Sequence, residues 1–291
     1  MPPANFESYW DTIDSELEAF PARPVFEELP MRSNEHCTVY ALRITSIGPY
    51  RIYGYLSVPK AEGPFPGLLM TPRYGSVNHI PDFNDRLRYV CLQIMHRGQR
   101  LADQPYAASY PGLLTESIDD PDQYIYRGIA ADCLRAAEYL LGRDNVDPAR
   151  VAVEGDDLAL ITASRRPGFT LVKAAGLMFY RIVERRRETD AYPIEEVNDY
   201  CWAFPGREAA ADRTLSLFDP QHHAGRLECD VILAVGGDDS WFQPLARELG
   251  EQYQPYQLTH RGGADHDALD QIVAERLGAE PMSRFIRAFD R

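Results

Sequence analysis

The chain has 291 residues, of which 45% are hydrophobic, and it carries a formal net charge of −14 at pH 7. This length and composition predict one large domain with a sizeable core. The strong negative charge argues against nucleic acid or an anionic membrane as a partner. The first residues lack the basic and apolar segments of a secretory signal, and no apolar run approaches the ~20 residues that span a bilayer. We therefore expect a cytoplasmic protein with no membrane association.

The predicted elements begin with an amphipathic helix over residues 4–19, in which apolar residues recur at helical spacing. Residues 38–46 and 50–59 alternate apolar and polar side chains around Gly48-Pro49, which predicts a hairpin. The core strands are predicted at 67–71, 88–96, 151–154, 172–178, 231–236 and 256–259. Helices are predicted between them, notably over 127–141 and 243–252. Strands that alternate with helices indicate an α/β fold, with a mostly parallel sheet covered by helices on both faces.

Two stretches interrupt this alternation. Residues 101–126 are rich in Pro, Gly, Asp and Tyr and are predicted to form a long loop, whereas residues 181–213 are highly charged. Long insertions over the C-terminal edge of such a sheet often form a lid or an oligomer contact. We therefore predict a single domain over residues 1–291 that carries these two inserted segments.

Residues 151–160 predict a short strand, a sharp turn and the start of a helix. This is the context of the nucleophile elbow Gly-x-Ser-x-Gly, where strain at the turn exposes the nucleophile at the C-terminal edge of the sheet. Here the segment reads Gly155-Asp156-Asp157-Leu158-Ala159, so an aspartate stands at the serine position. The sequence leaves open whether Asp157 is a working nucleophile or marks a lost activity.

Several motifs occur in a fixed order along the chain. They are Phe6-Glu-Ser-Tyr-Trp10, Arg51-Ile-Tyr-Gly-Tyr-Leu-Ser-Val-Pro59, Arg97-Gly-Gln99, Val146-Asp-Pro-Ala-Arg150 and Leu215-Ser-Leu-Phe-Asp219. Together they resemble the acetylxylan esterase and cephalosporin C deacetylase family of α/β-hydrolases over nearly the whole chain. The resemblance implies an α/β-hydrolase fold, a homo-oligomer and a triad of serine, aspartate and histidine in chain order.

On this resemblance the catalytic positions are Asp157, Asp239 and His266. Asp239 follows a predicted core strand in Gly236-Gly-Asp-Asp239, with Asp238 as the alternative acid. His266 follows the last predicted strand, with His260 as the alternative histidine. An Asp-His-Asp triad would therefore replace the family's Ser-His-Asp triad.

The resemblance also assigns two donors that would stabilise a developing oxyanion. They are the N–H groups of Tyr74, after the first core strand, and of Leu158. Arg73 stands where the family usually has a small residue. A guanidinium there would favour the ionised form of Asp157 or bind an anionic substrate.

An aspartate at the elbow, backed by a histidine and an acid, is the arrangement of haloalkane dehalogenases and epoxide hydrolases. In these enzymes the carboxylate attacks an sp³ carbon, and the histidine then activates water to hydrolyse the ester. We therefore predict a hydrolase that acts on a small organic substrate through Asp157, His266 and Asp239, without a cofactor. The alternative is a non-catalytic or ligand-binding relative in which Asp157 is inert. The Trp that binds halide is absent, because Leu158 follows Asp157.

A metal site is a third interpretation of the same acidic residues. Its ligands would be Asp156, Asp157, Asp238, Asp239 and His266, since oxygen-rich clusters suit hard cations. Adjacent aspartates on a turn usually point apart, and the chain has no HxxEH or similar signature. We therefore expect no metal.

Overall fold

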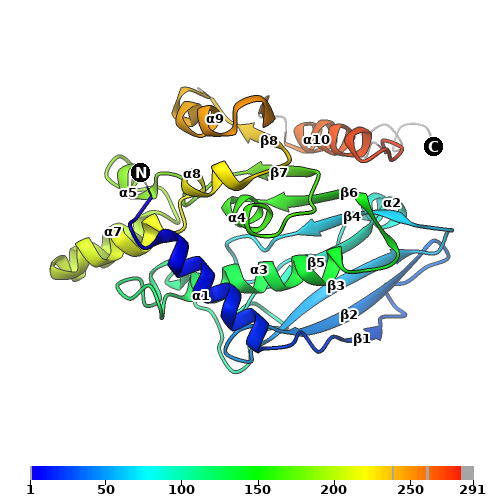
Figure 1. The fold of residues 1–291 in the computed structure, drawn as a ribbon, viewed down its shortest axis with the longest axis horizontal. Helices are drawn as coiled ribbons and strands as arrows, with labels where there is room; N and C mark the ends of the chain where they lie inside the picture. Colours follow the sequence, from blue (N-terminus) through cyan, green and yellow to red (C-terminus); the bar gives the residue numbers. More distant parts are fainter. Residues whose placement is uncertain (1, 238, 260–261, 283–291) are drawn as a thin grey trace.

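The computed structural model describes residues 2–237, 239–259 and 262–282, and the described chain is built around one sheet (Figure 1). Its nine described strands lie in the order β1-β2-β3-β5-β4-β6-β7-β8-β9. They are β1 (Val25–Glu28), β2 (Cys37–Thr45), β3 (Arg51–Pro59), β4 (Phe65–Met70), β5 (Val90–Met95), β6 (Val146–Gly155), β7 (Leu171–Ala175), β8 (Asp230–Val235) and β9 (Tyr253–Gln257). The pairs β1/β2, β2/β3 and β3/β5 are antiparallel, and the remaining five are parallel. The predicted mostly parallel sheet is confirmed.

Helices cover both faces of this sheet, as predicted (Figure 1). The longer ones are α1 (Phe6–Ala19), α2 (Phe83–Arg88), α3 (Ile125–Leu141), α4 (Asp157–Arg165), α6 (Glu195–Ala203), α7 (Glu208–Ser216), α9 (Gln243–Leu249) and α10 (Gly263–Arg276). Single turns form α5 (Ile182–Arg185) and α8 (Pro220–His223). Within the described ranges, none of these helices has both the length and the apolar character to cross a membrane.

The two faces of the sheet bury alternate residues of each core strand, as the two-residue period of a strand requires. Leu69 and Val153 pack in the larger cluster, with α1, α3 and α4. Their neighbours Leu68 and Ala152 pack in a smaller cluster, with α10. The predicted N-terminal helix is also confirmed, because the residues at helical spacing are all buried. They are Phe6, Tyr9, Trp10, Ile13 and Leu17.

Several elements were not predicted from the sequence, among them β1, α2 and α10. Some predicted boundaries were also wrong. The predicted strand 88–96 begins only at Val90, because Arg88 belongs to α2. The predicted strand 172–178 ends at Ala175, and the residues that follow form a loop beside the elbow. This early end of β7 determines the environment of Asp157.

The two inserted segments contact each other near the C-terminal edge of the sheet. Residues 101–124 form a long loop with one 3-10 turn and lead into α3, whereas residues 181–213 fold mainly into α5, α6 and α7. Glu196 of α6 accepts a hydrogen bond from the Gly112 N–H at 2.8 Å, and Arg207 forms an ion pair with Asp119 at 2.8 Å. The second insertion is therefore fixed to the first.

Candidate functional site

The elbow has the predicted strand, turn and helix, but its positive φ lies at Gly155 and not at the aspartate that replaces the nucleophile. β6 ends at Gly155, where a β-carbon would lie 1.9 Å from Thr71 Oγ1, so only glycine fits between the two strands. Asp156 is the N-cap of α4, with φ −110° and ψ −143°, and neither Asp156 nor Asp157 has a positive φ. A nucleophile elbow relies on a strained turn to lift its side chain. That strain is absent at Asp157.

The Asp157 side chain is sealed inside the protein. The residue is 1% exposed, and both carboxylate oxygens accept hydrogen bonds from main-chain amides of the loop after β7. The Met178 N–H donates to Oδ2 at 2.5 Å, and the Tyr180 N–H donates to Oδ1 at 3.0 Å. Asp157 thus satisfies two buried donors that would otherwise lack partners, which is a structural role.

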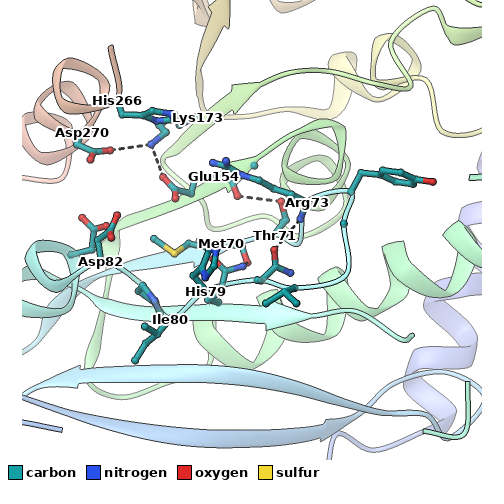
Figure 2. Close-up of a pocket in the computed structure, with 18 residues that line it drawn as sticks. Met70, Thr71, Arg73, His79, Ile80, Asp82, Glu154, Lys173, His266 and Asp270 are labelled. Carbon is teal, nitrogen blue, oxygen red and sulfur yellow. Dashed lines mark hydrogen bonds and ion pairs between the residues drawn. The ribbon is translucent and has the colours of Figure 1, made fainter. Parts of the chain in front are cut away.

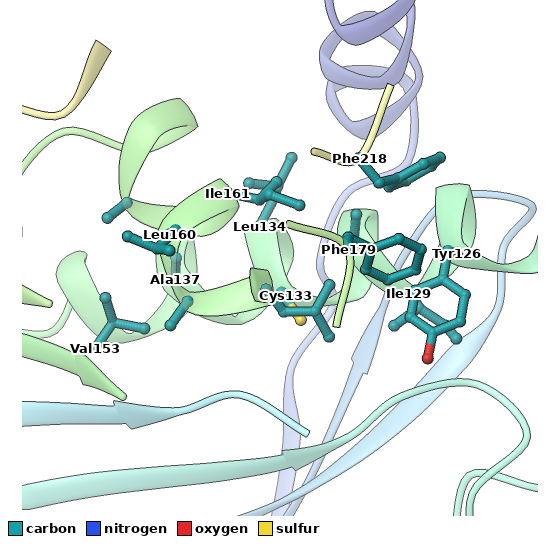
Figure 3. Packing of buried hydrophobic residues seen from close by; sticks show 14 of the residues in the cluster. Tyr126, Ile129, Cys133, Leu134, Ala137, Val153, Leu160, Ile161, Phe179 and Phe218 are labelled. Carbon is teal, nitrogen blue, oxygen red and sulfur yellow. The ribbon is translucent and has the colours of Figure 1, made fainter. Parts of the chain in front are cut away.

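The loop held by Asp157 is fixed from its other side as well. Phe179 lies between the two amide donors and is 1% exposed. Its ring packs against Tyr126 of α3, with centroids 4.7 Å apart, and against Phe218 at 5.7 Å (Figure 3). Release of Asp157 from this loop would therefore disturb the core.

Burial also changes the protonation of the elbow. It is the largest influence on Asp157 and raises the pKa of this carboxyl, and the neighbouring Asp156 charge raises it further. The amide hydrogen bonds act in the opposite direction without overcoming burial. No arginine or lysine forms a salt bridge with Asp157 among the described residues. The protonated form, which is a poor nucleophile, is therefore favoured.

The predicted triad partners do not gather around Asp157 in the described residues. His266 lies on α10, exposed, and faces a different cavity. The alternatives Asp238 and His260 lie outside the described residues. Asp239 begins the 3-10 turn Asp239–Phe242, but its side chain is likewise outside the description. No hydrogen bond joins Asp157 to His266.

One predicted oxyanion donor, the Leu158 N–H, has another partner, and so has the hydroxyl of Tyr74, although the predicted donor of Tyr74 is its N–H. The Leu158 N–H donates to Asp156 Oδ1 at 3.0 Å, within the N-cap of α4. The Tyr74 hydroxyl donates to Glu196 Oε1 at 2.5 Å, which ties this residue to the second insertion. Arg73 is exposed, and no hydrogen bond connects its guanidinium to Asp157. An expected contact between Arg73 and Asp157 is therefore not made.

A cavity of about 520 Å³, here called the charged cavity, lies between the loop after β4, α2 and α10 (Figure 2). At its floor the Lys173 Nζ atom is 2.7 Å from Glu154 Oε2 and 3.1 Å from Asp270 Oδ1. Burial alone would lower the pKa of Lys173, but the two carboxylates raise it above the usual range. Arg73 and His266 also line this cavity, whereas Asp157 does not.

The sequence did not predict a site formed by three charged residues of this cavity, which are Glu154, Lys173 and Asp270. A pattern that could have revealed two of them is a charged residue within an otherwise apolar core strand. Glu154 follows Val151-Ala-Val153, and Lys173 lies between Val172 and Ala174. Such a residue needs a buried partner, because an unpaired buried charge is costly. Asp270 supplies one partner from α10, an element that was not predicted.

The metal interpretation gains no support from the described residues, since no group of three or more possible ligands comes together among them. Two further features of the sequence, the Arg97-Gly-Gln99 motif and the cysteines, contribute to the interior of the fold. Arg97 forms a buried ion pair with Asp132 of α3 at 2.7 Å. All five cysteines are buried free thiols.

Comparisons with known proteins agree with the fold and extend along most of the chain. The model of a family described as acetyl xylan esterase (AXE1) matches residues 1–247. The acetyl esterase Axe7A of Xylanibacter ruminicola is 24% identical over 270 residues, which cover 83% of this chain. The match spans 58% of the length of that relative.

Two solved structures resemble this fold over nearly their whole length. An acetyl xylan esterase from Paenibacillus sp. R4 superposes with a TM-score of 0.81 at 21% identity, covering 95% of this chain and 96% of that chain. Acetyl xylan esterase 1 from a Thermoanaerobacterium species gives a TM-score of 0.74 at 22% identity, with 92% and 93% covered. The fold is therefore that of an α/β-hydrolase.

Proposed function

The chain belongs to the acetyl xylan esterase family, and from that premise we propose that it is a ligand-binding member whose elbow does not hydrolyse esters. The fold is retained, and the carboxylate at the serine position holds a loop. The ligand would be a small organic molecule, because the cavities near the C-terminal edge of the sheet have the size of small-molecule sites.

One observation carries this proposal: both Asp157 oxygens are hydrogen-bonded to the main chain of the loop after β7, out of contact with solvent. A nucleophile must be ionised and must reach the substrate. Burial opposes the first requirement by raising the pKa of Asp157. The Met178 and Tyr180 amides oppose the second, because they occupy the oxygens that would attack.

The chemistry of a carboxylate also argues against ester hydrolysis at this elbow. Attack of a carboxylate on an ester would form an anhydride, which is more reactive than the acyl-serine of a serine hydrolase. Esters are therefore poor substrates for an aspartate at this position. The Leu158 N–H is also committed to Asp156, so one expected oxyanion donor is occupied.

Hydrolysis through Asp157, His266 and Asp239 is the second candidate. It is favoured by the position of these residues after β6, β9 and β8, whose carboxyl ends meet at one edge of a parallel sheet. It requires Asp157 to leave the loop after β7, with Tyr74 and Leu158 then available to an oxyanion. Epoxides and alkyl halides are the substrates that suit an aspartate nucleophile.

The two candidates are separated by a hydrolysis assay on a panel of aryl acetates, epoxides and alkyl halides. Wild type is compared with Asp157→Asn, and both are first shown to be folded by circular dichroism. We expect no turnover above the uncatalysed rate with either protein. Turnover of an epoxide or halide that disappears in Asp157→Asn would overturn the proposal and establish the aspartate as a nucleophile.

A further inference from the structure

A second cavity, of about 630 Å³, lies between the ends of β7 and β8 and residues 185–194 of the second insertion. We call it the apolar cavity. Its walls come mostly from aliphatic and aromatic residues. They include Leu177, Met178, Ile194, Val235, Trp241 and Phe242. Ligands of parallel sheets bind at this edge, beyond the carboxyl ends of the strands.

One cation in this cavity lacks an acidic partner within the described residues. In the arginine-rich start of the second insertion, Arg181 is paired with Glu184, and Arg186 and Arg187 are paired with Asp212. Arg185 is different, because its Nη1 donates only to the Leu177 carbonyl, at 2.8 Å. It lines the apolar cavity and is partly buried. A guanidinium has further donors, which remain available to a ligand.

Residues 185–194, which line one side of the cavity, are fixed near both of their ends. Near their start, Arg186 is buried and donates to Glu208 at 2.6 Å and to Asp212 at 2.9 Å. After their end, Glu196 accepts hydrogen bonds from Tyr74 and Gly112. These contacts keep the cavity in place without a ligand, and a preformed site loses less entropy on binding.

The elbow supports the opposite wall. Met178 lines the cavity with its side chain while its N–H donates to Asp157. Leu177, the preceding residue, accepts the hydrogen bond from Arg185. Asp157 and Arg185 therefore hold adjacent residues of the same wall, so the elbow carboxylate contributes to the shape of the site.

We propose that the apolar cavity binds a small organic carboxylate, with its hydrocarbon or aromatic body among the apolar walls and its carboxylate on Arg185. This inference rests on the ligand-binding function proposed above and names the class of ligand. An apolar lining with one charged group is typical of small-molecule sites, and a guanidinium binds a carboxylate through two hydrogen bonds. The charged cavity is less suited to an anion, because Lys173 there already has two carboxylate partners.

Glu188 also lines the apolar cavity, and its side chain is exposed. Its negative charge opposes an anionic ligand, although solvent weakens this effect. The proposal therefore also predicts the effect on ligand affinity of replacing Glu188. Glu188→Gln should strengthen the binding of a carboxylate, whereas it should leave the binding of a neutral analogue unchanged.

The test is isothermal titration calorimetry of the full chain with 3-phenylpropionate and octanoate, using 3-phenylpropan-1-ol as the neutral analogue. We expect both carboxylates to bind better than the alcohol. Arg185→Gln should weaken carboxylate binding about tenfold or more, as expected for the loss of a hydrogen bond to a charged group. The matched control Arg187→Gln, which removes an exposed arginine paired with Asp212, should leave the affinity unchanged.

Arg185→Lys keeps the positive charge without the paired geometry, so it should bind with intermediate affinity and serves if Arg185→Gln does not fold. No binding of either carboxylate by folded wild type would overturn the inference, as would binding that is insensitive to Arg185→Gln or equal for acid and alcohol. Failure here is distinct from failure of the proposed function, because turnover in the hydrolysis panel is measured independently of binding.

Discussion

Two carboxylates near the end of β6, three residues apart, differ in burial and in partners, since Glu154 is partly exposed and Asp157 is buried. Glu154 has a cation beside it, since the Lys173 ammonium lies 2.7 Å away, and it lines the charged cavity. Asp157 has main-chain amides as its partners and is sealed in the core. A nearby cation keeps a buried carboxylate ionised, whereas burial without one favours the protonated form. The carboxylate of Glu154 thus forms an ion pair, whereas the carboxyl of Asp157 anchors a loop.

The largest loss of stability should come from replacing Lys173, the cation that is paired with Glu154. Lys173→Met leaves Glu154 and Asp270 together without their shared partner. Removal of one member of a buried ion pair typically costs about 3–5 kcal/mol, which is an upper bound for these partly exposed side chains. Urea unfolding measures this loss. The triple variant Lys173→Met, Glu154→Gln and Asp270→Asn should recover much of the stability. A loss as small as that of an exposed ion pair would show that the charges are well solvated.

A loss of similar size is expected at the elbow. Asp157→Ala leaves the buried Met178 and Tyr180 amides without acceptors, and each unsatisfied group costs about 1–3 kcal/mol. Asp157→Asn keeps one acceptor and should lose about half as much free energy of unfolding. Asp147→Ala is the surface control, because Asp147 also accepts from a nearby amide, that of Ala149, but in contact with solvent. Equal losses for Asp147→Ala and Asp157→Ala would contradict a buried structural role.

The smallest effect, counted per pH unit, should be a dependence of stability on pH that is specific to Asp157. Its pKa in the folded state is raised to about 8, above the unfolded value of about 4. Between these values the folded state binds more protons, so stability falls as pH rises, by at most about 1.4 kcal/mol per pH unit for one group. The stability advantage of wild type over Asp157→Asn should therefore be larger at pH 5 than at pH 8. An advantage that grows with pH would indicate an ionised, stabilised carboxylate.

Much of the fold could be predicted because hydrophobic periodicity determines it. The apolar spacing of α1 and the alternation of β2 and β3 are local properties of the sequence. β1 was missed because all four of its residues are exposed, so no buried face marks it. The turn after β6 was located correctly because a glycine ends an apolar stretch of the strand, which is also a local pattern of the sequence.

The environment of Asp157 could not be predicted in this way. Its partners are backbone amides at residues 178 and 180, and every residue except proline supplies such a donor. Their position depends on where β7 ends and on the packing of Phe179 against Tyr126. These are tertiary contacts, which local patterns do not specify. The resemblance to a hydrolase family identifies the position of Asp157 in the elbow, whereas the packing around Asp157 determines its structural role.

The most direct test of the buried elbow carboxylate is its own titration. Carbon-13 NMR of aspartate-labelled protein follows the carboxyl carbons from pH 3 to pH 9, and comparison with Asp157→Asn assigns the Asp157 signal. We predict that this signal titrates with an apparent pKa far above the ordinary aspartate value, near 8, because burial outweighs the two amide hydrogen bonds. A pKa near or below 4 would show an ionised carboxylate at neutral pH and would contradict the account that burial keeps the Asp157 carboxyl protonated.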